Sequence, residues 1–305
     1  MRLIGITMLR NEADIVEAFV RHNLSVLDGL VAIDHASVDG TGEILRALRD
    51  EGLPVTILRD PAPAFFQAER LTALARQLFA QQGADFVFPI DADEFLKVAS
   101  RSELDRVLAD VPPGSNAVMH WQTYVPTSAL APNDMPRLIA RRKAEAHGSY
   151  KCIVARVFVE RPGWYVASGN HLVGDQGSDR PTPHLRLPQH VAALAHFPVR
   201  SAEQLERKVV LGHLAHRATR PGNNRLASHW SELFAYLRDG GTFDADALRH
   251  IAYNYGLPRD TWRAIGEDDL VRDPLDFRFD LRYGGRIAPD TLRVLMRFTE
   301  ALLAQ

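Results

Sequence analysis

The first ninety residues alternate between short apolar runs and segments in which apolar residues recur at every third or fourth position. The apolar runs have the length of strands and cover residues 3–8, 30–33, 55–58 and 86–90. Helical spacing between these runs is carried by Ile15, Phe19, Ile44, Leu48, Leu71, Leu74 and Leu78. Alternating strands and helices predict the α/β class, with a mainly parallel sheet sandwiched by helices. Ligands of such sheets bind at the carboxyl ends of the strands.

The pattern changes after the Pro-Pro-Gly sequence at residues 112–114. Runs of strand character at residues 117–124 and 153–159 are separated by loops rich in Pro, Asn and Asp, which favours antiparallel or mixed pairing. Helical spacing returns in residues 202–214, 226–238, 245–255 and 289–303. We therefore expect residues 1–112 and 113–220 to be two halves of one domain, and residues 221–305 to be a helical C-terminal extension.

Composition narrows the classes of function. Of the 305 residues, 46% are hydrophobic and 24% are charged, as in ordinary globular proteins. The 36 Lys and Arg against 38 Asp and Glu give a net charge of -2, so we expect no nucleic-acid partner. No apolar run approaches the roughly 20 residues of a membrane-spanning helix, so any membrane contact would be peripheral. With one cysteine, Cys152, and no recognisable signal peptide, the expected location is the cytoplasm.

Three carboxylates directly follow the fourth apolar run, at Asp91, Asp93 and Glu94. In an extended segment, residues two apart point to the same side, so Asp91 and Asp93 can converge on one cation. Oxygen ligands of this kind suit Mn²⁺ or Mg²⁺, which leave coordination positions for diphosphate oxygens. The alternative is an acidic surface turn that caps a following helix.

Three motifs in order give the chain a family resemblance: residues 8–12 (MLRNE), 33–41 (IDHASVDGT) and 89–96 (PIDADEFL). Together they resemble family 2 glycosyltransferases, above all the bacterial branch whose aspartate motif continues into Glu-Phe-Leu. The resemblance is strong over the first hundred residues and continues weakly through residues 151–154 and 195–201. It implies a GT-A fold and the metal-dependent transfer of a sugar, with inversion, from a nucleoside-diphosphate sugar to a glycan or other hydroxyl acceptor.

The resemblance also implies roles for individual side chains. It makes residues 1–112 the nucleotide-sugar-binding half and residues 113–220 the half that completes the acceptor and metal sites. The donor nucleotide, with UDP favoured, would lie beside Thr7, Asn11, Glu12 and Asp34. Asp93 would be the main metal ligand, and Asp91 would lie near the ribose and the metal. His35 stands where the family usually has Asp or Asn, which leaves the identity of the base open.

The remaining chemistry calls for cations and a base. Basic groups can neutralise the leaving diphosphate, and the candidates are Lys151 and Arg200, with Lys208 as a further one. Metal centres of GT-A transferases often take a histidine from the C-terminal half, and His196 is our choice because apolar neighbours surround it. Deprotonation of the acceptor hydroxyl needs a base, for which we choose His171 or Asp175. The sequence leaves Glu94 and Glu203 open as alternatives.

Two other functions compete with this interpretation. A phosphohydrolase could use Asp91 as nucleophile and Asp93 as acid, because two aspartates after an apolar strand suit it as well. A noncatalytic module could bind a nucleotide-sugar or a glycan as a regulator or scaffold. A Rossmann dehydrogenase is set aside, because no Gly-x-Gly-x-x-Gly follows the first apolar run.

Overall fold

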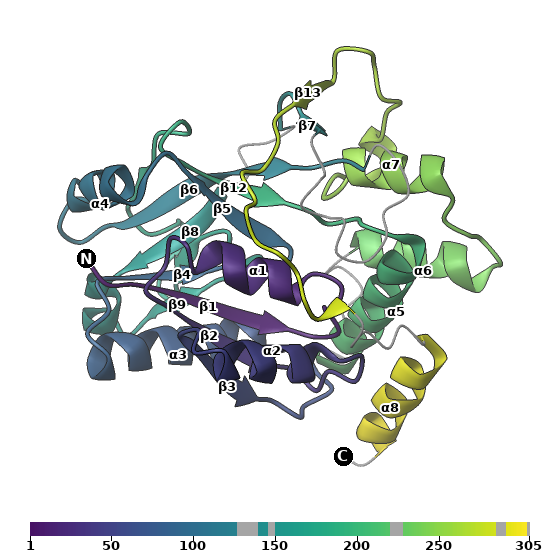
Figure 1. Cartoon of the computed structure of the whole chain (residues 1–305), viewed down its shortest axis with the longest axis horizontal. Coiled ribbons are helices and arrows are strands. Elements are labelled where there is room, and N and C mark those ends of the chain that lie inside the picture. The colour runs from purple at the N-terminus through teal and green to yellow at the C-terminus, as the bar shows by residue number, and fades with distance from the viewer. Residues whose placement is uncertain (127–139, 146–149, 220–227, 285–290, 304–305) are drawn as a thin grey trace.

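One large sheet organises the computed structural model, which describes residues 1–126, 140–145, 150–219, 228–284 and 291–303 (Figure 1). The strand order is β3-β2-β1-β4-β8-β6-β12-β5, and β11 pairs with β6 outside this path. The bounds are β1 Leu3–Leu9, β2 Gly29–Asp34, β3 Val55–Arg59, β4 Phe86–Pro89, β5 Glu94–Val98, β6 Asn116–Thr123, β8 Tyr150–Ala155, β11 His184–Arg186 and β12 Ala192–His196.

The N-terminal half is a parallel sheet with helices on both faces. Strands β3, β2, β1 and β4 all run parallel, and every residue of β1 and β2 is buried. Helices α1 (Val16–Asn23) and α2 (Thr41–Asp50) pack on one face, and α3 (Gln67–Gln81) packs on the other. Helix α4 (Arg101–Ala109) joins the first group. The predicted α/β class, with a mainly parallel sheet sandwiched by helices, is confirmed.

Mixed pairing begins at β8, which is antiparallel to both β4 and β6. Strand β12 runs parallel to β6 and antiparallel to β5. The strand predicted for residues 153–159 ends at Ala155, and residues Arg156–Glu160 form the 3-10 helix η2 instead. Ala155 pairs with Phe86, the first residue of β4, so the chain beyond it has no strand to pair with. Two small sheets join β9 (Trp164–Val166) to β10 (Val173–Asp175), and β7 (Ala140–Arg142) to β13 (Leu270–Arg272).

The C-terminal part is helical, as the spacing predicts. It contains α5 (Ala202–Thr219), α6 (Ser228–Arg238), α7 (Ala245–Tyr253) and α8 (Thr291–Leu303), with the 3-10 turn η4 (Arg259–Thr261) after α7. Helices α5, α6 and α7 share an apolar core of their own, and α8 packs on α5. Within the described ranges, no helix is both long and apolar enough to cross a bilayer.

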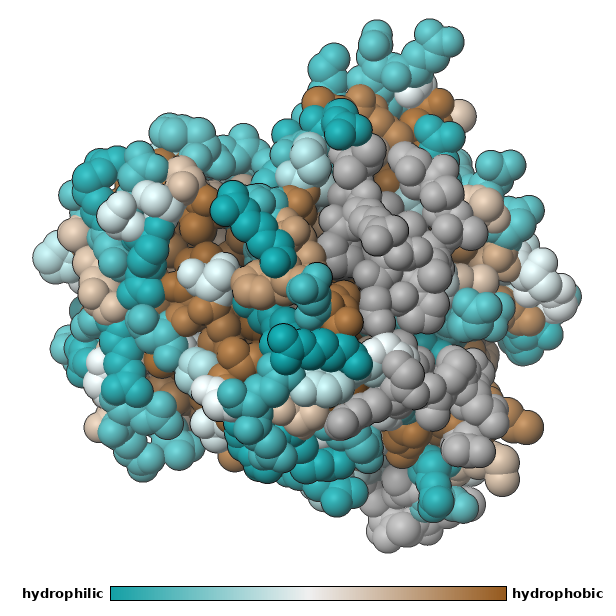
Figure 2. Space-filling view, in the orientation of Figure 1, coloured by the Kyte–Doolittle hydropathy of each residue, from teal (hydrophilic) through white to brown (hydrophobic). Residues whose placement is uncertain are grey.

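A non-helical segment of this C-terminal part packs against the first half of the chain. The chain after β13 runs across α1, where Leu275 enters the main core (Figure 1). At the end of this segment, the buried Glu17 carboxylate accepts hydrogen bonds from the backbone N–H groups of Arg282 and Tyr283, at 2.9 and 2.8 Å. The visible face around it is largely hydrophilic, with apolar side chains gathered near its middle (Figure 2).

Candidate active site

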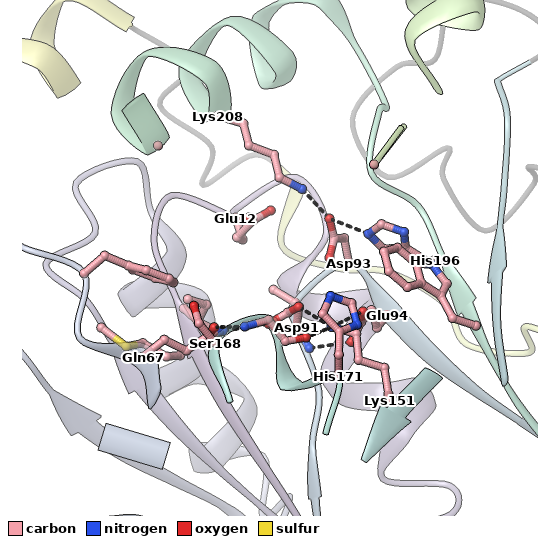
Figure 3. A pocket seen from close by; sticks show the side chains of 18 of the residues that line it. Glu12, Gln67, Asp91, Asp93, Glu94, Lys151, Ser168, His171, His196 and Lys208 are labelled. Carbon is pink, nitrogen blue, oxygen red and sulfur yellow. Dashed lines mark hydrogen bonds and ion pairs between the residues drawn. The ribbon is translucent and has the colours of Figure 1, made fainter. Parts of the chain in front are cut away.

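A cavity of about 810 Å³ opens where the carboxyl ends of β1 and β4 meet β6, β8 and α5. It is lined by polar, aromatic and aliphatic side chains from all parts of the chain, and Figure 3 shows most of its charged groups. The lining includes Arg10, Asn11, Glu12, His35, Gln67, Asp91, Asp93, Glu94, Trp121, Tyr150, Lys151, His171, Arg186, His196, Lys208 and Tyr255.

Asp91 is fixed by donors from three different elements. Its Oδ2 accepts from Lys151 Nζ of β8 at 2.6 Å. Its Oδ1 accepts from Gln67 Nε2 at the start of α3, at 2.9 Å, and from Asn170 Nδ2 of the 3-10 turn η3 (Ser168–Asn170), at 3.1 Å. The carboxylate is therefore held at the junction of α3, β8 and η3.

Lys151 is buried and paired with more than one acceptor. Its Nζ also lies 2.7 Å from Glu94 Oε1 and donates to the carbonyl of Gly169 at 2.7 Å. Burial opposes the ammonium, but Asp91 and Glu94 outweigh it, so the pKa of Lys151 is raised. Burial raises the pKa of Glu94 to about 8, against the pull of Lys151. Glu94 Oε2 accepts from the backbone N–H of Asp91 at 2.8 Å and so braces the turn between β4 and β5.

Asp93 faces a different set of groups. Its Oδ2 lies 2.5 Å from Lys208 Nζ of α5, 3.6 Å from His196 Nε2 and 3.9 Å from Arg200 Nη1. Burial would raise its pKa, but Lys208 and His196 hold the pKa of Asp93 well below its usual range. The structure thus brings Asp93 and His196 together, while the Asp91 carboxylate turns to Lys151 (Figure 3).

His196 sits at the end of β12 as a neutral imidazole, because burial lowers its pKa to about 4. The ring packs edge-on against Trp121, at a centroid distance of 4.4 Å, and against Tyr255 at 5.2 Å. Among the described residues, its Nδ1 has no hydrogen-bond partner. A neutral imidazole beside a carboxylate is suited to binding a divalent cation.

Arg200 lies behind the cavity wall. Its guanidinium contacts Asp14 Oδ2 at 2.6 Å and Glu12 Oε2 at 2.6 Å. Glu12 lines the cavity, and burial raises its pKa to about 7, with Arg200 opposing. Next to it, Asn11 adopts a positive φ of 57° and its Oδ1 accepts from the N–H of Val38. Arg200 therefore positions Glu12, and the structure does not place it on the cavity wall.

Two residues predicted beside the nucleotide lie outside the cavity lining. Thr7 is fully buried within β1. Asp34 ends β2, but its Oδ1 accepts from the N–H of Ser37 at 3.0 Å, so this carboxylate closes its own loop. His35, the following residue, does reach the cavity.

The two residues predicted as base are separated. His171 lines the cavity, and its Nδ1 is 3.0 Å from the carbonyl oxygen of Tyr150. Because a carbonyl can only accept, Nδ1 carries the proton and Nε2 keeps its lone pair in the neutral ring. Asp175 lies on β10 beside a separate surface hollow, where it accepts from Gly177. The alternative Glu203 is exposed on α5, whereas Glu94 lines the cavity.

Sequence reasoning missed several groups around the carboxylates. Gln67 and Asn170 hold Asp91, and Trp121 and Tyr255 pack against His196. The Ser-Gly-Asn sequence before His171 was a usable signal, because a glycine and an asparagine are the residues that take positive φ, here 77° and 60°. Nothing local marks Tyr255, which reaches the cavity through the packing of α7.

The side chains around Asp93 can be compared with the ligands that the predicted Mn²⁺ or Mg²⁺ requires. Among the described residues, no three His, Cys, Asp or Glu side chains gather as a metal-binding group. Asp93 with the neutral His196 nevertheless fits such an ion, since Mg²⁺ is commonly held by one or two protein groups and takes its other oxygens from phosphates and water. In this structure Lys208 balances the charge of Asp93.

Comparisons with family models and with curated proteins give no match. Among solved structures, the chain is similar to TarS 1-349 of S. aureus, at 13% identity and a TM-score of 0.38, over 92% of this chain and 99% of that chain. It is also similar to the mannosyltransferase PcManGT from Pyrobaculum calidifontis in complex with GDP-Man and Mn²⁺, at 18% identity and a TM-score of 0.39, over 81% and 78%. At these TM-scores the likenesses carry no conclusion about activity.

Proposed function

We propose that the chain is a glycosyltransferase of GT-A type that uses a divalent cation and moves a sugar from a nucleoside-diphosphate sugar, with UDP favoured, to a hydroxyl acceptor. One observation carries the proposal. Asp91 and Asp93 leave the end of β4 and line a single cavity, where each is matched by a lysine from a different element, Lys151 or Lys208. This arrangement supports binding of a polyanionic donor at the carboxyl edge of the sheet.

The cation would be held by Asp93 and His196 with help from donor oxygens, and it would stabilise the negative charge of the departing diphosphate. The residues of the chain account for the other requirements. Lys208 adds positive charge on the same side as Asp93. Asp91 is clamped by three donors, so it offers a fixed acceptor to the ribose of the donor.

His171 is the base that this geometry favours. Its Nε2 lone pair is available, and its ring is oriented by the Tyr150 carbonyl and by stacking on Trp121. In the proposed step, the acceptor oxygen bonds to the anomeric carbon from the face opposite the diphosphate. The proton of the hydroxyl passes to His171, and the diphosphate leaves with the electron pair of the broken C–O bond. This displacement inverts the anomeric configuration.

Donor binding tests the proposal without a known acceptor. We expect UDP-sugars with Mn²⁺ to raise the melting temperature of the full chain, because a ligand of the folded state stabilises it by mass action. Asp93→Asn should weaken Mn²⁺-dependent UDP binding by at least about tenfold, since it removes a ligand charge. The exposed Asp246→Asn on α7 serves as the control. Unchanged UDP and Mn²⁺ binding in Asp93→Asn would contradict the proposal.

Slow hydrolysis separates the competing functions. A transferase with no acceptor releases UDP slowly from its donor when Mn²⁺ is present. A phosphohydrolase cleaves p-nitrophenyl phosphate, and a noncatalytic binding module does neither. We expect Mn²⁺-dependent release of UDP and no release of p-nitrophenol, and the opposite pattern would favour the hydrolase.

A further inference from the structure

The cavity has two chemically different walls. Asn11 and His35 form one of them, at the ends of β1 and β2. Trp121, Tyr150 and Arg186 form the other, on β6, β8 and β11. Asp91 lines the same cavity and is bound by Gln67 from α3 and by Lys151 from β8. If the donor lies along the first wall, its reacting carbon faces the second.

The second wall carries several rings, which are linked to one another and to the carboxylates by the following contacts. The Arg186 guanidinium lies over the Tyr150 ring at 5.0 Å. His171 donates to the Tyr150 carbonyl, and its ring stacks on Trp121 at a centroid distance of 5.3 Å with 17° between the planes. Lys151 Nζ lies 5.5 Å from the centroid of the same Trp121 ring and pairs with Asp91. A molecule on this wall would touch Arg186 at one end and His171 near the other.

Arg186 differs from three other cations that line the cavity, Arg10, Lys151 and Lys208. Lys151 and Lys208 pair with carboxylates, and Arg10 donates to the carbonyls of His35, Ala62 and Pro63. Within the described part of the chain, Arg186 has the Tyr150 ring as a contact and no carboxylate or hydrogen-bond partner. Stacking on Tyr150 orients the planar guanidinium of Arg186, whose N–H groups can donate two parallel hydrogen bonds to a phosphate or carboxylate group.

We propose that the acceptor is a small hydroxylated molecule that carries a phosphate or carboxylate group. Arg186 binds the anionic group, the Tyr150 ring supports the body of the acceptor, and the reacting hydroxyl points to His171. This inference rests on the proposed glycosyltransferase function and specifies the acceptor class of the same cavity. Arg186 determines the acceptor specificity and takes no part in the transfer step.

Direct binding tests the inference. The full chain with saturating UDP and Mn²⁺ is titrated with matched hexoses in three forms: the 6-phosphate, the uronate and the neutral sugar. We expect at least one anionic form to bind about 10-fold more tightly than its neutral counterpart, as the loss of a charge-assisted hydrogen bond implies. The phosphate and uronate series tell the two anionic groups apart. Equal affinity of all three forms would overturn the inference.

Variants of Arg186 test whether this residue causes the preference for anionic acceptors. Arg186→Gln should abolish the anion preference and leave the affinity for UDP unchanged. Arg186→Lys should retain part of the anion preference, because Lys keeps the positive charge but cannot donate two parallel hydrogen bonds. Arg238→Gln, an exposed and ion-paired arginine on α6, is the matched control. An anion preference that survives Arg186→Gln contradicts the inference. UDP binding is measured on the same samples, so a failed donor site is recognised separately from a failed acceptor site.

Discussion

Asp91 and Asp93 stand two positions apart, yet their carboxylates meet different partners. Asp91 is bound by Lys151, Gln67 and Asn170, whereas Asp93 lies beside Lys208 and His196. The reason is the turn that follows β4, which Glu94 closes by accepting from the N–H of Asp91. The spacing of the two aspartates therefore predicts their shared cavity, and the turn decides the direction of each side chain.

The protonation state of His171 gives a test of its proposed role as the base. His171 is exposed as a whole residue, but desolvation of its ring by the surrounding side chains and repulsion from Lys151 lower its pKa below the ordinary value of 6.5, against the hydrogen bond to the Tyr150 carbonyl and a weaker pull from Asp91. A base must be neutral to accept a proton. We therefore expect kcat/KM to stay constant as the pH falls through 6.5 and to decline only as the pH approaches the lowered pKa of His171. His171→Gln should lower the rate by about 10²–10⁴-fold and remove this acidic limb. The exposed His190→Gln is the control, and a pH profile unaltered by His171→Gln would exclude His171 as the base.

The 3-10 turn η3 connects the residues that hold Asp91 with the proposed base, His171. Asn170 bonds Asp91, Gly169 bonds both Gln67 and Lys151 through its backbone, and His171 follows directly. A Cβ on Gly169 would lie 2.9 Å from His171 Nε2, and its φ of 77° favours glycine. The turn thus needs glycine both for its conformation and for the space beside the proposed base.

Gly169→Ala should separate these two requirements when it is compared with Gly114→Ala. Gly114 has a similar φ of 81° but nothing within 4 Å of an added Cβ. Both variants should lose about 1 kcal/mol in the free energy of unfolding, measured with urea. Only Gly169→Ala should also reduce UDP-sugar turnover, because it displaces His171. Equal turnover in the two variants would show that η3 does not set the position of the base.

The sequence predicts the local patterns of this fold better than the contacts between distant segments. The parallel half and the four C-terminal helices follow from hydrophobic spacing within each segment. The contacts between distant segments do not follow from this spacing. Lys208 contacts Asp93 across 115 positions, and Arg282 contacts Glu17 across 265. The strand β5 also escaped prediction, because its apolar residues Phe95 and Leu96 sit among the charged ones of the motif.

The hydrogen bonds at Glu17 hold the segment after β13 against helix α1 of the first half. The buried Glu17 carboxylate accepts from the N–H groups of Arg282 and Tyr283 and pairs with Arg21 at 3.0 Å. Glu17→Ala leaves these donors unmatched, so we expect a loss of about 3 kcal/mol in the free energy of unfolding in urea. Glu69→Ala, an exposed glutamate in the first turn of α3, should cost less than about 0.5 kcal/mol. If both variants unfold at the same urea concentration, the segment after β13 does not stabilise α1, and the C-terminal part behaves as an appendage.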